Sequence, residues 1–248
     1  MLSGCADKQT SADVSNTASF QLPADAGPGG AGGACTSSLL LATAKDAEDG
    51  RDDHTWVSLL DAMRETLKGK GYEQIPQLSS SRKLDLQHGK FSLLNPEAAA
   101  GSKKRAVLVG INYVGQRGEL RGCHNDVLSM KRFIEKRGFS DMRVLMDDSS
   151  HEQPTGKNIL VAIDWLTEGA SKGDSLFLHY SGHGGYVKDD NGDEADGMDE
   201  TIVPVDFQSA GQIIDDLLFK ELVMPIPAGV QLTYVVVLLG GGGVGGVV

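Results

Sequence analysis

The chain has 248 residues, which is enough for one large α/β domain or two small ones with a sizeable core. Its 23 basic and 34 acidic residues give a net charge of −11, which argues against nucleic acids and anionic membranes as partners and permits a basic substrate or a bound cation. The three cysteines, Cys5, Cys35 and Cys123, have no disulfide-framework spacing, so we expect a reducing, cytoplasmic location. No signal peptide is expected at the N-terminus.

The first hundred residues predict one clear helix. A loop rich in glycine, alanine and proline is expected over residues 21–35. Thr55 is the expected N-cap of a helix with an apolar stripe of Trp56, Leu59, Leu60, Met63 and Leu67, which Gly69 and Gly71 end. Residues 72–94 read as extended chain, and residues 95–102 read as a linker.

After Lys103 the pattern changes to strands that alternate with helices. Four apolar runs, 105–113, 142–148, 174–184 and 229–239, are typical of buried strands. Two helices separate them: one over 124–138, capped by Asn125 or Asp126, and one over 155–170, capped by Thr155 with Ile159, Ala162, Ile163 and Leu166 inward. This alternation predicts a mostly parallel sheet with helices on both faces. The uncharged tail after Leu232 is expected to be a strand that runs into glycine-rich chain over 240–248.

Two histidines follow each other in the third apolar run, "FLHYSGHGG". His183 lies between glycines just past the expected strand end, where sites of parallel sheets occur, so a catalytic or ligand role is favoured over a turn histidine. His179 lies inside the strand, where a half-buried histidine with its hydrogen bonds satisfied is expected.

The segment "DDNGDEADGMDE" over residues 189–200 holds seven acidic residues. It is either a solvated loop or a calcium site, because flexible oxygen-rich loops suit that ion. Glu194 occupies the place where an EF-hand needs glycine, so that motif is absent. Asp215 and Asp216 are adjacent carboxylates that repel each other unless a cation or base offsets their charge.

The segment "LRGCHNDV" places Cys123 just before a helix. A helix N-terminus lowers a thiol pKa, so Cys123 is a candidate nucleophile, although a buried residue behind the site is the favoured interpretation. Asp126 is equally explained as a helix cap.

Together these segments resemble type I metacaspases, which are caspase-like cysteine peptidases. The resemblance rests on "RAVLVGINY", "LRGCHNDV", "HYSGHGG", "NGDEADGMDETIVPVDF" and "IIDD", and it covers most of residues 103–234. It implies a caspase-like α/β sandwich, here incomplete. Residues 1–94, with "LSGCADKQTSADVSNTASF", are similar to the part that follows the nucleophile in that family. The two parts thus stand in reversed order, as in a circular permutant or in two neighbouring gene copies read as one.

The resemblance implies calcium-dependent proteolysis after Arg or Lys. It makes His183 the catalytic histidine and Asp199, Asp215 and Asp216 calcium ligands. It also makes Cys123, Asp126 and Ser181 the lining of an acidic pocket for basic peptide substrates. The family's Asp-Cys-Cys-His-Ser-Gly-like motif is missing after "GVQLTYVVV", where the chain reads "LLGGGGVGGVV". We therefore expect an inactive member of the family. The alternatives are a non-catalytic, calcium-binding pseudopeptidase or interaction module, and a gene-assembly product without a function of its own.

Overall fold

Strands from both halves of the chain build one sheet in the computed structural model, which describes residues 1–5, 9, 11–22, 30–49, 54–81, 83–86, 88–189, 192 and 197–239. The six strands lie in the order β4-β1-β11-β7-β5-β6, and only β4 runs antiparallel to its neighbour. They are β1 (Leu2–Ser3), β4 (Gln77–Leu78), β5 (Lys104–Gly110), β6 (Asp141–Met146), β7 (Ser175–Gly182) and β11 (Gln231–Leu238). The expected mostly parallel sheet is confirmed.

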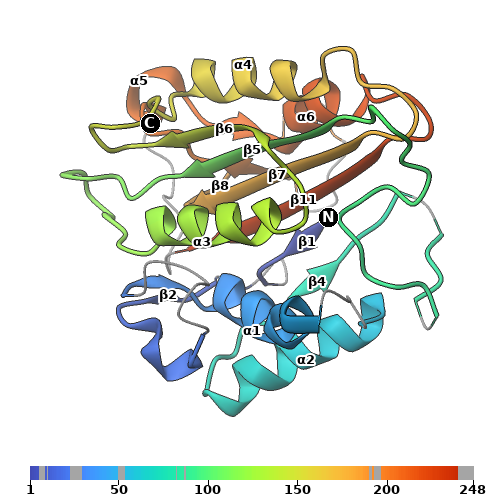
Figure 1. Cartoon of the computed structure of the whole chain (residues 1–248). Coiled ribbons are helices and arrows are strands. Elements are labelled where there is room, and N and C mark those ends of the chain that lie inside the picture. Colours follow the sequence, from blue (N-terminus) through green and yellow to red (C-terminus); the bar gives the residue numbers. More distant parts are fainter. Residues whose placement is uncertain are drawn as a thin grey trace.

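The helices cover both faces of the sheet, as Figure 1 shows, with α4 and α6 on one face and α1, α2 and α3 on the other. Their bounds are α1 (Ala34–Asp49), α2 (Trp56–Gly69), α3 (Cys123–Glu135), α4 (Gly156–Thr167) and α6 (Asp215–Leu218). The remaining elements are short: β2 (Asp13–Val14), η1 (Thr17–Phe20), β3 (Gly32–Gly33), β8 (Gly184–Lys188), β9 (Met198–Ile202), α5 (Phe207–Ala210), β10 (Ile213–Ile214) and η2 (Phe219–Val223). No described helix is long and apolar enough to cross a membrane.

The strands and helices that the apolar patterns predict are formed, with small shifts at their ends. All eight residues of β7 are buried because helices lie on both faces of the sheet. The Thr155 side chain accepts a hydrogen bond from the Asn158 N–H and caps α4, and the four predicted inward residues are buried. Thr55 caps α2 through a reciprocal hydrogen-bond pair with Ser58.

One prediction near the N-terminus is wrong. The loop expected over 21–35 contains β3 and the first two residues of α1, and α1 itself was not predicted. Residues 72–94 contain only the short β4 as regular structure within their described part. Residues 23–29 of the expected loop and the tail 240–248 lie outside the described residues.

The two segments of the chain share one core. The pairing of β1 with β11 sets Leu2 beside Val235 and Ser3 beside Val236, so the N-terminal segment extends the sheet that the C-terminal segment begins (Figure 1). Eight buried residues of the N-terminal segment belong to the main core cluster: Leu2, Cys35, Leu39, Leu40, Leu59, Met63, Phe91 and Leu93.

The linker predicted over residues 95–102 is anchored by buried hydrogen bonds. The Asn95 side chain donates to the backbone carbonyls of Asp174 (3.2 Å) and Gly229 (2.7 Å) and accepts from the Glu97 N–H. The Asn95 N–H donates to Ser175 Oγ at 2.9 Å. The linker is thereby held against the turns that precede β7 and β11.

We expect Asn95→Ala to lower the free energy of unfolding by about 2–3 kcal/mol, because two carbonyls lose their donor at a largely buried site. Urea unfolding followed by circular dichroism measures the effect. The matched control is Glu97→Ala, which removes an exposed ion pair with Lys172 and is expected to cost less than about 1 kcal/mol. Equal losses in the two variants would contradict the anchoring role of Asn95.

Candidate functional site

The end of β7 places His183 at the carboxyl end of the sheet. His183 follows the last residue of β7, and it is half-buried between Gly182 and Gly184. The register pairs Gly182 with Leu238 of β11, and the Leu239 N–H donates to the Gly182 carbonyl at 2.8 Å. Leu239, the residue that follows β11 in the same chain, therefore lies beside His183.

Both ring nitrogens of His183 face backbone carbonyl oxygens. Nε2 lies 2.6 Å from the Gly118 oxygen, and Nδ1 lies 2.9 Å from the Leu239 oxygen. A carbonyl oxygen only accepts, and a neutral imidazole carries one proton. A neutral ring can donate to only one of the two oxygens, and the shorter contact favours Nε2 as the donor. The Nδ1 lone pair would then face an acceptor oxygen, so Nδ1 can act as a base only when the Leu239 carbonyl moves aside.

The residue that accepts from His183 was not predicted from the sequence. Gly118 contributes only its backbone oxygen, and its φ of 86° belongs to the left-handed region that glycine tolerates. A side chain here would also press on the histidine, because an added Cβ would lie 3.2 Å from His183 Nε2. A glycine within a loop that reaches the carboxyl end of the sheet is the only signal that the sequence offers.

The predicted pocket residues Cys123, Asp126 and Ser181 come together beside this site. Ser181 Oγ donates to Asp126 Oδ2 at 2.9 Å, and the Gly33 N–H donates to Asp126 Oδ1 at 2.7 Å. All three predicted residues are fully or almost fully buried. Gly33 of β3 thus closes the carboxylate off from solvent, and its glycine identity is required because a Cβ would lie 2.5 Å from Asp126 Oδ2.

One prediction about this cluster is wrong, and one is confirmed. Asp126 is not the cap of α3, because the N-cap is Gly122, which makes no side-chain capping bond, and Asp126 lies in the first turn with its carboxylate in the core. The favoured interpretation of Cys123 as a buried residue behind the site is confirmed, and the alternative of a thiol activated by the helix N-terminus is excluded. Burial, and then the neighbouring Asp126 carboxylate, raise the pKa of Cys123 well above its usual value. Cys123 is thus a buried residue and not an activated thiol.

Burial raises the pKa of Asp126 from 3.8 to about 7, although hydrogen bonds from Gly33 and Ser181 oppose this. The folded chain then binds a proton between about pH 4 and pH 7 that the unfolded chain does not, so stability is present at low pH and is lost as the pH rises. The slope is at most about 1.4 kcal/mol per pH unit.

We expect Asp126→Asn to remove most of this pH dependence, because asparagine keeps an acceptor for the Gly33 N–H and carries no charge. Urea midpoints of the wild type and the variant at pH 5 and pH 8 measure the difference. The exposed Asp61→Asn is the control and is expected to retain the wild-type slope. If Asp126→Asn also retained that slope, the buried carboxyl would not be its source.

His179 is not the half-buried histidine with satisfied hydrogen bonds that the sequence predicts. It is fully buried, and Nδ1 contacts the Val235 carbonyl at 3.2 Å, whereas Nε2 has no partner among the described residues. Burial lowers the pKa of His179 to about 4, so the ring is neutral at physiological pH. It belongs to the core and not to the site of His183.

The predicted calcium ligands lie on adjoining elements. Asp199 is a buried residue of β9, which pairs with β10, and β10 leads directly into Asp215 and Asp216 at the start of α6. Within the described part of the chain, no three His, Cys, Asp or Glu residues form a group that could hold a metal ion. Residues 190, 191 and 193–196 of the acidic segment lie outside the described residues.

The remaining thiols lie away from His183. The Cys5 thiol donates to the Gln9 carbonyl, and Cys35 is buried in the core cluster. No described thiol makes a hydrogen bond with either ring nitrogen of His183. Nδ1 contacts the backbone oxygen of the aliphatic Leu239, which directly follows β11.

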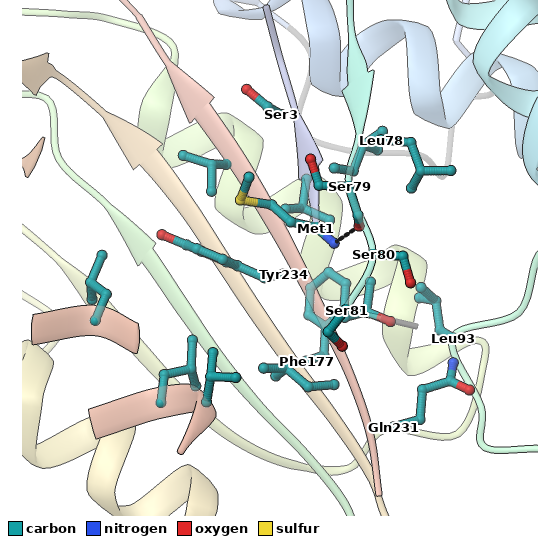
Figure 2. Close-up of a pocket in the computed structure, with 18 of the residues that line it drawn as sticks. Met1, Ser3, Leu78, Ser79, Ser80, Ser81, Leu93, Phe177, Gln231 and Tyr234 are labelled. Carbon is teal, nitrogen blue, oxygen red and sulfur yellow. Dashed lines mark hydrogen bonds between the residues drawn. The ribbon is translucent and has the colours of Figure 1, made fainter. Parts of the chain in front are cut away.

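A separate cavity of about 980 Å³ lies where β1 and β4 meet β11. In Figure 2, Met1, Ser79 and Tyr234 lie around it, and the Met1 amino group donates to the Ser79 carbonyl at 2.7 Å. His183 does not line this cavity. The cavity is thus a feature of the seam between the two segments of the chain.

Comparison with known proteins identifies the family. The metacaspase, peptidase C14 domain family matches residues 104–237. "Metacaspase III c" of Phaeodactylum tricornutum is 48% identical over 237 residues, which are 94% of this chain and 69% of that protein. The chain belongs to the metacaspase family. The resemblance to metacaspases that the sequence shows is confirmed at the family level. The caspase-like fold class is confirmed with it.

Other relatives match this metacaspase over one segment only. "Metacaspase-1" of Mycosarcoma maydis is 53% identical over 135 residues, and the match spans 34% of its length. "Metacaspase-1" of Coccidioides immitis is 52% identical over 136 residues, which span 29% of its length. A protein of Geobacter sulfurreducens with a crystal structure is 34% identical, with a TM-score of 0.45 over 54% of this chain and 49% of that one.

Proposed function

We propose that the chain carries the histidine half and the specificity pocket of a calcium-dependent cysteine endopeptidase that cleaves after Arg or Lys. The observation that carries the proposal is the setting of His183, with Nε2 on the Gly118 carbonyl and Nδ1 toward the end of β11. A base held in this way would deprotonate a thiol at that place, and the thiolate would attack the scissile carbonyl. The resulting imidazolium would then protonate the leaving amine.

The preference for Arg or Lys is supported by Asp126. Its carboxylate lies beside Ser181 and Cys123 and would pair with a cationic substrate side chain. The Gly33 N–H donates a hydrogen bond to the Asp126 carboxylate in this structure. Substrate binding there would therefore require β3 to move away from Asp126.

The calcium proposal is supported by the chemistry of the donors. Asp199, Asp215 and Asp216 offer carboxylate oxygens, which calcium prefers, on elements that adjoin each other. When bound, the ion would supply positive charge that holds β9 and α6 together. The proposal assigns the ion no part in bond cleavage.

We also propose that the chain is inactive on its own, because Leu239 stands where the thiol would be needed. This observation favours a second candidate, a non-catalytic, calcium-binding pseudopeptidase or interaction module.

We propose further that the reversed order of the two segments is the native order of this chain. The match to the Phaeodactylum tricornutum protein, which extends over 94% of this chain, and the buried contacts of Asn95 support it.

Three measurements test the proposed function. Purified protein is given a fluorogenic Arg peptide with and without calcium, beside His183→Ala. We expect no cleavage, and calcium-dependent cleavage that disappears in His183→Ala would contradict the proposed inactivity.

Binding of an arginine peptide and of its uncharged citrulline counterpart is then compared by NMR titration. We expect at least tenfold tighter binding of arginine, and equal binding would contradict the assigned pocket. Calcium binding is measured by calorimetry, and no heat of binding would contradict the calcium proposal.

A further inference from the structure

Two buried tyrosines bind the backbone of His183. The Tyr113 hydroxyl accepts from the His183 N–H (2.9 Å) and donates to the Val203 carbonyl (2.6 Å). The Tyr180 hydroxyl accepts from the Val203 N–H (3.1 Å) and donates to the His183 carbonyl (2.8 Å). Each phenol thus bridges the same two residues in opposite senses, and the two hydroxyl oxygens lie 3.2 Å apart.

The Tyr113 ring also contacts the His183 imidazole directly. The two ring centroids are 4.6 Å apart with an angle of 35° between the planes. Tyr113 therefore holds His183 by the face of its ring and by its backbone N–H at once. Burial keeps both phenols protonated by raising their pKa values well above the usual range, so each hydroxyl retains the proton that it donates.

Tyr113 belongs to the same loop as the Gly118 carbonyl that accepts from Nε2. This loop is closed by the Leu120 N–H, which donates to the Asn112 carbonyl at 2.7 Å. Asp147 accepts hydrogen bonds from the Asn112 and Val114 N–H groups on either side of Tyr113. The loop thus contacts the imidazole at a face and at an edge.

The backbone around this contact is unusual at two places. Tyr113 has a φ of 53°, in the left-handed region that residues other than glycine rarely adopt. Gly182 leaves the space that the phenols fill, because an added Cβ would lie 2.6 Å from Tyr180 Oη and 3.1 Å from Tyr113 Oη. Strained backbone kept next to a functional side chain is typical of sites whose geometry is fixed in advance.

We propose that Tyr113, with Tyr180, is a positioning residue of the site: it fixes the His183 backbone and ring so that Nε2 carries the proton and Nδ1 faces residue 239. The inference rests on the proposed role of His183. Its test reads the tautomer of the ring and needs no activity, so its failure is distinguishable from failure of the proposed function.

The test uses ¹⁵N-detected imidazole NMR of the full chain at a pH where the ring is neutral, with His183→Ala to assign the signals. The wild type is expected to show His183 chiefly as the Nε2–H tautomer. In Tyr113→Phe we expect the Nδ1–H fraction to rise at least threefold, because the ring stays but the hydroxyl that holds the His183 N–H is lost. Tyr180→Phe is expected to change the fraction in the same direction.

Tyr234→Phe is the matched control, because its hydroxyl makes no hydrogen bond in the described structure and it lies in the cavity at the β1–β11 seam. We expect no change of the His183 signals in this variant. A folded Tyr113→Phe protein with wild-type His183 signals would overturn the proposal. If Tyr113→Phe does not fold, Tyr180→Phe decides, and unchanged His183 signals in that variant would overturn it as well.

Discussion

Residues 95–248 expressed without the N-terminal segment are expected to show no cooperative unfolding transition. Removal of residues 1–94 takes away β1, one of the two parallel partners of β11, and the two helices α1 and α2, and it exposes the face that eight buried core residues of that segment cover. Each large apolar side chain contributes roughly 1.5–3 kcal/mol when it is buried. For the seven large apolar residues among the eight this amounts to about 10–21 kcal/mol, which is similar to or larger than the roughly 5–15 kcal/mol by which whole domains are stable.

Urea titration followed by far-UV circular dichroism, with dye binding as a report of exposed apolar surface, measures this loss. The matched control is the full chain with a protease site inserted between Ala99 and Ala100, both of which are exposed. After cleavage we expect the two pieces to remain together and to unfold in one transition, because the sheet and core are intact. A cooperative transition of residues 95–248 alone, at the midpoint of the full chain, would show that the segments are independent units.

The elements that could be predicted are those whose pattern matches their surroundings. Helix α4 has a polar face, an apolar face and a threonine cap, and each feature is visible in the sequence. Strands β5, β7 and β11 are apolar runs because helices or neighbouring segments cover them on both faces. The position of His183 followed from the rule that sites of parallel sheets lie at the carboxyl ends of strands.

Helix α1 could not be predicted, because its first turns have no polar face. Residues 34–40 are all buried, so the 3.6-residue periodicity of an amphipathic helix is missing. Its hydroxyl side chains, which usually disfavour helix interiors, bond back to the helix: Ser38 donates to the Cys35 carbonyl and Thr43 to the Leu39 carbonyl. Burial between α2, α3 and the sheet overrides the weak intrinsic helix propensity.

The misread parts of the site depend on contacts between distant residues. Asp126 looks like a cap in sequence, but its partner is the Gly33 N–H, 93 positions earlier. Gly118 acts through a backbone oxygen, which no residue type reveals. The bridging role of Tyr113 depends on a backbone conformation that its residue type disfavours. Such features become visible only when the chain is folded.

The second large effect is expected from a thiol placed at position 239. The Leu239 N–H donates to the Gly182 carbonyl, and the Leu239 carbonyl oxygen lies 2.9 Å from His183 Nδ1. Leu239 directly follows the last registered pair, Gly182 and Leu238, and so comes beside His183, which directly follows the same pair on β7. A cysteine here would lie next to the imidazole, which favours the thiolate and therefore raises its reactivity at neutral pH.

The replacement of leucine by the smaller cysteine is expected to cost about 1–3 kcal/mol, because Leu239 is almost fully buried. If residues 183 and 239 act independently, the loss of stability caused by Leu239→Cys is the same with and without the histidine side chain. Comparison of Leu239→Cys with the double variant Leu239→Cys/His183→Ala therefore isolates the effect of the imidazole on the thiol.

The rate at which iodoacetamide alkylates Leu239→Cys at pH 7 tests most directly whether His183 faces residue 239 as a base. Mass spectrometry of the intact protein follows the label, and the wild type, whose three thiols are buried and make no hydrogen bond with His183 in the described structure, is expected to stay unlabelled over the same time. Leu239 is almost fully buried as well, so the labelling of Leu239→Cys is expected to depend on the imidazole and not on exposure. We expect Leu239→Cys to react at least tenfold faster than Leu239→Cys/His183→Ala. Equal rates in these two variants, or stoichiometric labelling of the wild type, would contradict the account.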